Sequence, residues 1–205
     1  MKLNLPRGFK TRAENLSLDV RKQLGLRPTH PCPARQVAGL YGYSVTSTKS
    51  LIELLEGGFK DSFISSDTPI DDLLLINQTG FSGMMAVLRS QKMLFYNDQE
   101  SVERQESVIM HEMAHAFCEH PGDDLQLCSD MGMRQHNHIH EEEARWLGGV
   151  LQIPYVGLFW YAKQGYSVEA IARAYKASVE MAQYRWNMCG IASRIARLRT
   201  AVLPR

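Results

Sequence analysis

The feature that most constrains this chain is the pentapeptide His-Glu-Met-Ala-His at residues 111–115. In an α-helix, residues four apart lie one turn apart on the same face, so His111 and His115 can direct both imidazole rings at one metal ion. The flanking residues of the stretch 108–117 are mainly apolar, which indicates a buried helix. Two histidines and an acid inside such a helix are costly without partners. The pattern therefore predicts a zinc site.

Glu112 stands beside these two candidate ligands. A zinc ion held by three protein ligands lowers the pKa of its bound water to about 7, and an adjacent carboxylate can accept the proton as that water attacks a carbonyl. The sequence therefore favours metal-assisted hydrolysis, most often of a peptide bond, with Glu112 as the catalytic acid/base. The alternative is an amphipathic helix whose histidines only satisfy hydrogen bonds in the core.

A third ligand must come from elsewhere in the chain. The extended pattern H-E-x-x-H-x-x-G-x-x-H is excluded, because Cys118 and Pro121 stand where its glycine and third histidine would be. Three carboxylates at 141–143 open a second helical pattern, and Glu143 heads the apolar stripe of that helix. This position favours Glu143 as the ligand. Glu141 remains an alternative, as does a solvated acidic first turn.

Three histidines alternate just before this second helix, at positions 136, 138 and 140. We expect a polar loop here. His138 and His140 are candidate donors of a hydrogen bond to the oxyanion of a tetrahedral intermediate, and direct metal binding by these histidines is a further alternative.

The composition is that of an ordinary globular chain, with 205 residues, 44% of them hydrophobic and 22% charged. This length allows one sizeable core or two small ones. No run approaches the 18 or so apolar residues of a membrane span, and the first residues lack the apolar segment of a signal peptide. The four cysteines are widely spaced, without a C-x-x-C pair, so a disulfide framework is unnecessary. We therefore expect a cytoplasmic protein without membrane contact.

Hydrophobic periodicity predicts the local structure. Helices are expected at 11–24, 34–41 and 50–55, and strands at 43–47, 63–64, 73–76, 84–88 and 93–96. The last two strands form a hairpin that turns near Ser90, and the central helix begins at an N-cap formed by Asp98 or Ser101. The expected fold is α+β and mainly helical, with a small antiparallel or mixed sheet packed on the active-site helix. An exposed edge strand of that sheet would suit an extended peptide substrate.

We expect three parts along the chain. They are an N-terminal segment of helices and a strand at 1–58, a zinc metallopeptidase core at 59–162, and a C-terminal helical segment at 163–205. The last part is basic, with eight Lys and Arg against two acidic residues.

The C-terminal segment follows a helix-turn-helix pattern, with Ser167 and Ser178 as N-caps and a break at 177–178. DNA binding is therefore a second hypothesis, in which the zinc core is structural or inactive. A helical pair packed on the core explains the same apolar positions. Basic residues at 194, 197 and 199 are either a solvated helix face or a docking surface for a regulatory partner.

Residues 93–154 resemble the ImmA/IrrE family of metallo-endopeptidases. The resemblance begins at Tyr96-Asn97 and Arg104-Gln105 and includes the motif at 111–115. The family's second motif, Glu-Ala-Asn-x-Phe-Ala-x-x-Leu-Leu-Met-Pro, aligns without gaps on 143–154. In this motif Arg145, Leu147 and Gly148 replace Asn, Phe and Ala.

This resemblance implies a gluzincin-type zinc peptidase with a zincin-like core. His111, His115 and Glu143 would be the zinc ligands and Glu112 the catalytic acid/base. It also implies a regulatory protease whose protein substrate is a transcriptional repressor, of the kind found in phages, mobile elements and stress responses. The three replacements leave the ligand set intact and bear on the hydrogen bonds around it.

Overall fold

The computed structural model describes residues 5–54, 82–88, 91–120 and 137–202. The elements in this part of the chain are α1 (Phe9–Gln23), α2 (Ala34–Leu40), β1 (Tyr43–Ser47), α3 (Thr48–Leu54), β2 (Gly83–Leu88), β3 (Gln91–Tyr96), α6 (Val102–Phe117), α7 (His138–Gln152), α8 (Tyr155–Lys163), α9 (Val168–Tyr175), α10 (Val179–Met188) and α11 (Ile191–Val202). The chain is mainly helical with a small mixed sheet, which confirms the predicted α+β class. None of the described helices has the length and apolar character needed to span a membrane.

The sheet has the strand order β1-β3-β2. β1 runs parallel to β3, with Val45 opposite Leu94, and β2 runs antiparallel to β3, with Leu88 opposite Gln91. The predicted hairpin is therefore present, although its turn at 89–90 and the predicted strands at 63–64 and 73–76 lie outside the described residues. Within the described sheet β3 is central, and β1 and β2 are the edges.

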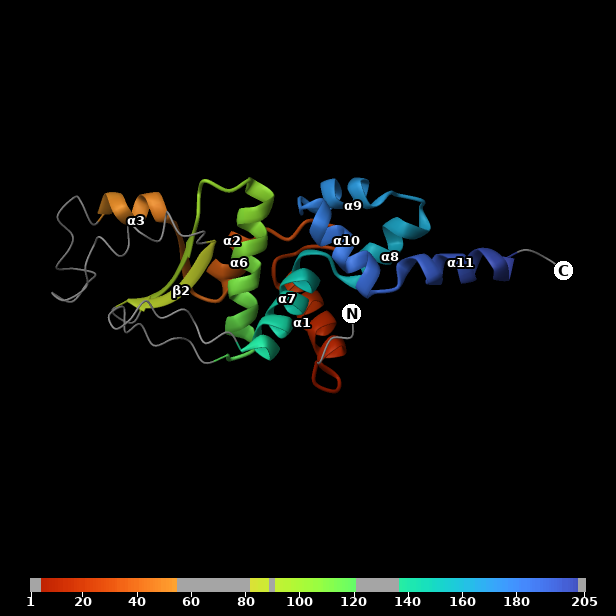
Figure 1. Cartoon of the computed structure of the whole chain (residues 1–205), viewed down its shortest axis with the longest axis horizontal. Helices are drawn as coiled ribbons and strands as arrows, with labels where there is room; N and C mark the ends of the chain where they lie inside the picture. The colour runs from red at the N-terminus through yellow and green to blue at the C-terminus, as the bar shows by residue number, and fades with distance from the viewer. Residues whose placement is uncertain (1–4, 55–81, 89–90, 121–136, 203–205) are drawn as a thin grey trace.

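Helix α6 lies between the sheet and α7 (Figure 1). Ser101 is its N-cap, since the Ser101 hydroxyl accepts a hydrogen bond from the Arg104 amide at 3.3 Å. Glu103 places a negative charge in the first turn, where the helix dipole favours it. The helix is buried along most of its length from Ser107 onward, as expected for the predicted active-site helix.

Helix α7 (His138–Gln152) begins three residues earlier than the sequence indicated, which was at Glu141. Asn137 is its N-cap, and the Asn137 side chain accepts a hydrogen bond from the Ile139 amide at 3.1 Å. His138 and His140 therefore belong to the first helical turn, and the loop predicted for them is wrong. The physical reason is that the Asn137 cap satisfies one of the free amides of the first turn, and it does so whatever residues occupy that turn.

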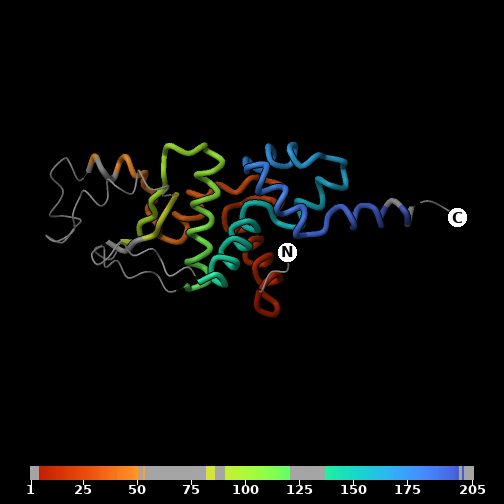
Figure 2. The backbone as a smooth tube through the Cα atoms, viewed as in Figure 1, coloured from red at the N-terminus to blue at the C-terminus, as the bar shows by residue number. Residues whose placement is uncertain are grey.

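The segment after α7 forms a second apolar core. The first core joins α1, α2, α6, α7 and β3, whereas the second joins α8, α9, α10 and the start of α11. The break between α9 and α10 comes where predicted, with Ser167 and Ser178 as N-caps. Figure 2 shows α11 extending away from the rest of the chain. The predicted boundaries near 58 and 162 stay predictions.

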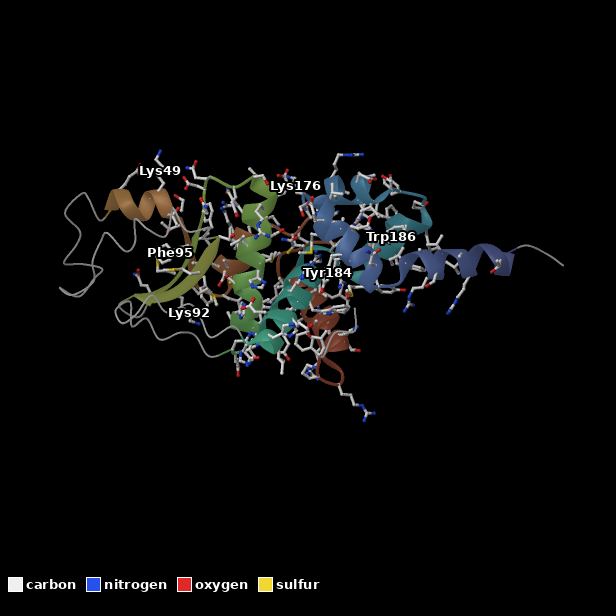
Figure 3. All side chains as sticks on the ribbon, in the orientation of Figure 1. Lys49, Lys92, Phe95, Lys176, Tyr184 and Trp186 are labelled. Carbon is white, nitrogen blue, oxygen red and sulfur yellow. The ribbon has the colours of Figure 1, made fainter. Side chains whose placement is uncertain are left out.

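The two cores are joined by a buried arginine on α10. Arg185 is 0% exposed, and it donates hydrogen bonds to the Ile153 carbonyl at 2.9 Å and to the Glu14 carboxylate at 2.6 Å. The other oxygen of Glu14 accepts the Tyr155 amide at the start of α8. Tyr184 of α10 is labelled in Figure 3. The Arg145 guanidinium of α7 lies over its ring, 4.8 Å from the ring centroid.

Candidate metal centre

Three side chains from α6 and α7 bring their donor atoms together. Nε2 of His111 and Nε2 of His115 lie 3.1 Å apart. A carboxylate oxygen of Glu141 lies 3.2 Å from His111 Nε2, and the other oxygen lies 3.5 Å from His115 Nε2. The two ring nitrogens and the Glu141 carboxylate, called the triangle below, form one of two groups of candidate metal-binding side chains among the described residues.

The dimensions of this triangle fit a metal ion. Ligands bound at 2.0–2.1 Å to a tetrahedral zinc ion lie about 3.3 Å from one another, and the three observed separations are close to this value. Two imidazole nitrogens and one carboxylate are also ligands that zinc commonly takes in proteins. Three protein ligands leave the fourth tetrahedral position for water or substrate. The residue types and the separations of His111, His115 and Glu141 therefore fit a metal ion.

The structure does not bring Glu143 to this triangle. A Glu143 carboxylate oxygen instead lies 2.7 Å from His120 Nε2. The apolar stripe headed by Glu143 would meet the two histidines only if the face of α7 that bears Gly148 pointed away from α6. In the structure Gly148 faces α6, and a Cβ added there would lie 3.2–3.3 Å from backbone atoms of Met110 and His111. The face of α7 that bears Gly148 is therefore the face closest to α6. Glu141 lies on the same face, because it precedes Gly148 by seven residues, or two helical turns.

Glu112 is buried beside the triangle, with 4% of its surface exposed. It lies next to the first residue of β2, because a Cβ added to Gly83 would be 3.6 Å from Glu112 Cγ and would overlap Val108 Cγ1. Glycine at this position therefore lets the backbone of an edge strand approach the Glu112 side chain. The predicted acid/base, two of the predicted ligands and a sheet edge lie within one small region.

A second group of donors stands behind His115. It consists of Cys118, His120 and Glu143, whose donor atoms lie within 4.8 Å of one another. Nδ1 of His120 is 2.9 Å from Nδ1 of His115. Burial and, to a smaller extent, the charge of Glu143 raise the pKa of the Cys118 thiol to about 11, so this sulfur is a neutral thiol at pH 7.

The two candidate oxyanion donors occupy different environments. The His138 side chain is 77% exposed, and its Nε2 lies 3.8 Å from Glu142. The His140 ring stacks on the His120 ring, with centroids 4.2 Å apart and an angle of 13° between the planes. His140 thus lies in the layer behind the triangle, and a hydrogen bond from either histidine to an oxyanion stays a prediction.

Sequence reasoning missed the contact between His120 and His115. In the sequence, His120 marks only the end of the central helix, because Pro121 and Gly122 follow it. Its position five residues after His115 gave no helical signal, because residues five apart do not share a face of an α-helix. The contact depends on how the chain turns after α6, which hydrophobic periodicity does not report.

The sequence was also compared with families of known proteins. The family model Peptidase_M78, described as the IrrE N-terminal-like domain, matches residues 73–187. No curated protein and no solved structure matches the chain significantly. The matched residues make up more than half of the chain and include both helices that bear the triangle. The chain therefore belongs to the peptidase family described as IrrE N-terminal-like, and its predicted membership of the ImmA/IrrE family is confirmed.

Proposed function

We propose that this protein is a zinc-dependent endopeptidase of the cytoplasm. The observation that carries the proposal is the convergence of His111, His115 and Glu141 beside the buried carboxylate of Glu112. In this proposal Glu141 is the third zinc ligand. The sequence had favoured Glu143 for this role, with Glu141 as the alternative. The bound zinc ion supplies a Lewis acid that activates water and polarises the scissile carbonyl.

Each residue of the site has a distinct task. Nε2 of His111, Nε2 of His115 and the carboxylate of Glu141 hold the ion. The Glu112 carboxylate accepts a proton from the attacking water and later delivers it to the amine nitrogen of the leaving peptide. Burial of Glu112 keeps bulk water from this proton, and it also strengthens the electrostatic interactions of the carboxylate with the reacting atoms.

Strand β2 supplies a surface for the substrate backbone. It is an edge of the described sheet, and its first residue approaches Glu112 without an intervening side chain. An extended peptide that pairs with β2 would gain main-chain hydrogen bonds and lie across the catalytic carboxylate. This mode of binding favours an unfolded or exposed segment of a protein. We propose a transcriptional repressor as that protein, in keeping with the family resemblance.

The test is co-expression with the transcriptional regulator encoded beside this protein. The wild type should cut the regulator. Glu112→Gln should leave it intact, with cleavage reduced by at least about 100-fold, since a positioned general base contributes 10²–10⁴-fold. Glu112→Gln should keep the zinc content of the wild type, because Glu112 is not a ligand.

Two controls make this result specific. Glu103→Gln removes a carboxylate from the exposed first turn of the same helix and should preserve cleavage. Glu141→Ala removes a ligand and should lower zinc affinity by more than about 100-fold, since even residues behind the ligands contribute 10–100-fold. A purified wild type that contains no near-stoichiometric zinc would contradict the proposal.

The DNA-binding alternative stays a prediction, with little support from α10. Arg185 is the one basic residue in Val179–Met188, and it is fully buried. The helix that would enter the major groove thus presents no cation to phosphate. Salt-dependent binding of the full chain to duplex DNA, with cleavage of protein unaffected by Glu112→Gln, would favour that alternative.

A further inference from the structure

The chain turns sharply at the end of α6 and brings His120 back against His115. Cys118 is the C-cap, and Glu119 has a left-handed backbone, with φ of 52°. The His120 amide donates to the His115 carbonyl at 3.1 Å, and the Glu119 amide donates to the Ala116 carbonyl at 3.2 Å. These two bonds define a Schellman motif. Glycine usually occupies the left-handed position, so a glutamate there indicates that the surroundings hold this turn in place.

The turn places His120 in a chain of hydrogen bonds that ends on a carboxylate. His115 Nδ1 lies 2.9 Å from His120 Nδ1, and His120 Nε2 lies 2.7 Å from a Glu143 oxygen. The His120 and Glu143 side chains are only 6% and 12% exposed. A nearly buried carboxylate is costly unless a strong donor satisfies it. The ring of His140 stacks on His120 and fixes its plane.

The position of each proton follows from the contacts. His115 directs Nε2 at the triangle of donors, so its proton must be on Nδ1 when Nε2 binds a metal. His115 Nδ1–H then donates to His120 Nδ1, which leaves the proton of His120 on Nε2. That proton is donated to Glu143. With one tautomer of each ring, the hydrogen bonds of His115, His120 and Glu143 are all satisfied.

We propose that His120 and Glu143 are positioning residues that hold His115 in the tautomer and orientation needed to bind the metal. This inference rests on the proposed function, because it assigns His115 to a metal. The negative charge of Glu143, passed through two imidazoles, makes His115 Nε2 a better electron donor. Ligating histidines commonly donate their second ring N–H to a carboxylate, and here a second histidine extends that arrangement.

A second metal ion at Cys118, His120 and Glu143 is the competing interpretation of the same cluster. Two observations disfavour it. The separation of 2.7 Å between His120 Nε2 and Glu143 is that of a charge-assisted hydrogen bond, and it is shorter than the separation between two ligands of one zinc ion. A metal on His120 Nε2 would also move the His120 proton to Nδ1, where it would face the proton on His115 Nδ1.

The test measures the zinc dissociation constant of the full-length protein by competition with a chromophoric chelator. Glu143→Gln and His120→Leu should each weaken zinc binding by about 10–100-fold. His120→Asn should recover part of this loss, because the Asn oxygen can still accept the proton of His115 Nδ1. The double variant Glu143→Gln/His120→Leu should bind zinc no more weakly than the weaker of the two single variants, since both act through one chain.

The matched control is Glu142→Gln, which removes the same charge from the same helical turn. It should keep the zinc affinity of the wild type. Thermal unfolding of each variant in excess chelator separates a folding defect from a binding defect, because it reports on the metal-free protein. The visible spectrum of the cobalt-substituted protein should stay that of the wild type in Glu143→Gln and change in Glu141→Ala, which loses a ligand.

Three outcomes would overturn the inference. In the first, the zinc dissociation constants of Glu143→Gln and His120→Leu lie within about twofold of the constant of Glu142→Gln. In the second, both variants unfold at a lower temperature in excess chelator but keep the zinc affinity of the wild type. In the third, the wild type binds two zinc ions and Cys118→Ala binds one. In each of these cases the wild type still contains zinc and still cleaves its substrate, whereas failure of the proposed function itself would appear as a wild type without zinc.

Discussion

Glu141 and Glu143 stand two positions apart on one helix and lie on opposite sides of the same histidine. Glu141 contacts the ring nitrogen of His115 that faces the triangle, whereas Glu143 reaches the other ring nitrogen through His120. One turn of α7 therefore supplies both a candidate ligand and the charge behind a ligand. Substitutions at these two positions should differ in kind, since one changes the ligand set and the other changes its strength.

Glu119 gives a prediction about stability at the residue scale. Its left-handed backbone costs a residue with a side chain about 1 kcal/mol relative to glycine. Glu119→Gly should therefore raise the free energy of unfolding by about 0.5–1 kcal/mol, as measured by chemical denaturation, and leave zinc affinity unchanged. Glu119→Ala keeps the Cβ and should show no such gain. An equal gain in both variants would mean that the glutamate side chain, and not its backbone, is the source of the cost.

At the scale of elements, the approach of α7 to α6 determines which carboxylate reaches the two histidines. Gly148 is the point of closest contact, since a side chain there would press on the backbone of Met110 and His111. A shift of α7 away from α6 would carry Glu141 with it, seven residues along the same face. The geometry of the triangle thus depends on a residue that has no donor atom.

Substitution of Gly148 tests this dependence. Gly148→Val should lower the free energy of unfolding by about 1–3 kcal/mol through overpacking, and it should also weaken zinc binding. Gly148→Ala requires a displacement of only a few tenths of an ångström and should have a smaller effect of the same sign. Gly39→Ala is the matched control, because Gly39 is an exposed helical glycine with no atom near its missing Cβ. It should be neutral or stabilising by up to about 1 kcal/mol. Unchanged zinc affinity in Gly148→Val would contradict the dependence.

The elements that the sequence predicted well are those with a clear period. The strand at 43–47 has the predicted bounds, and α6 begins at one of the two predicted caps. Helix α8 was not predicted, because Tyr155–Lys163 is apolar on nearly all sides and contains Gly157. That glycine is required by packing, since a Cβ there would overlap the Tyr175 hydroxyl and the Pro28 carbonyl.

The identity of the third ligand was harder to predict than the presence of a site. The two histidines and Glu112 depend only on helical spacing within one element, which the sequence contains. The choice between Glu141 and Glu143 depends on how α7 is rotated about its own axis. Helix α7 contacts three other helices, α6, α1 and α10, so an apolar stripe could not identify the face that meets the histidines.

On the scale of the whole molecule, two apolar cores are held together by the contacts of Arg185. This side chain and Glu14 form an ion pair that links α10 to α1, and Glu14 also accepts the first amide of α8. Loss of one partner from a buried pair leaves the other charge without compensation. The link therefore couples the stability of the C-terminal helices to that of the core that carries the triangle.

Arg185→Met should lower the free energy of unfolding by about 3 kcal/mol, because the Glu14 carboxylate would lose its partner. The double variant Glu14→Gln/Arg185→Met should recover part of this loss, since the substituted amide is neutral and its oxygen can still accept the Tyr155 amide. Arg173→Met, which changes an exposed arginine of α9, should have an effect within about 0.5 kcal/mol. Denaturant unfolding monitored by tryptophan fluorescence measures the free energy of unfolding of all three variants. Equal effects of Arg185→Met and Arg173→Met would show that the link contributes little.

The three donors of the triangle belong to two consecutive helices, and residues 121–136 lie between those helices in the sequence. An ion that joins His115 to Glu141 therefore acts as a reversible cross-link around a closed stretch of chain. A cross-link that closes the stretch from residue 115 to residue 141 would reduce the conformational entropy of the unfolded chain by an amount worth about 3.5 kcal/mol. Under the proposed function, the supply of zinc would then set the lifetime of the folded protein as well as its activity, and metal starvation would remove both together.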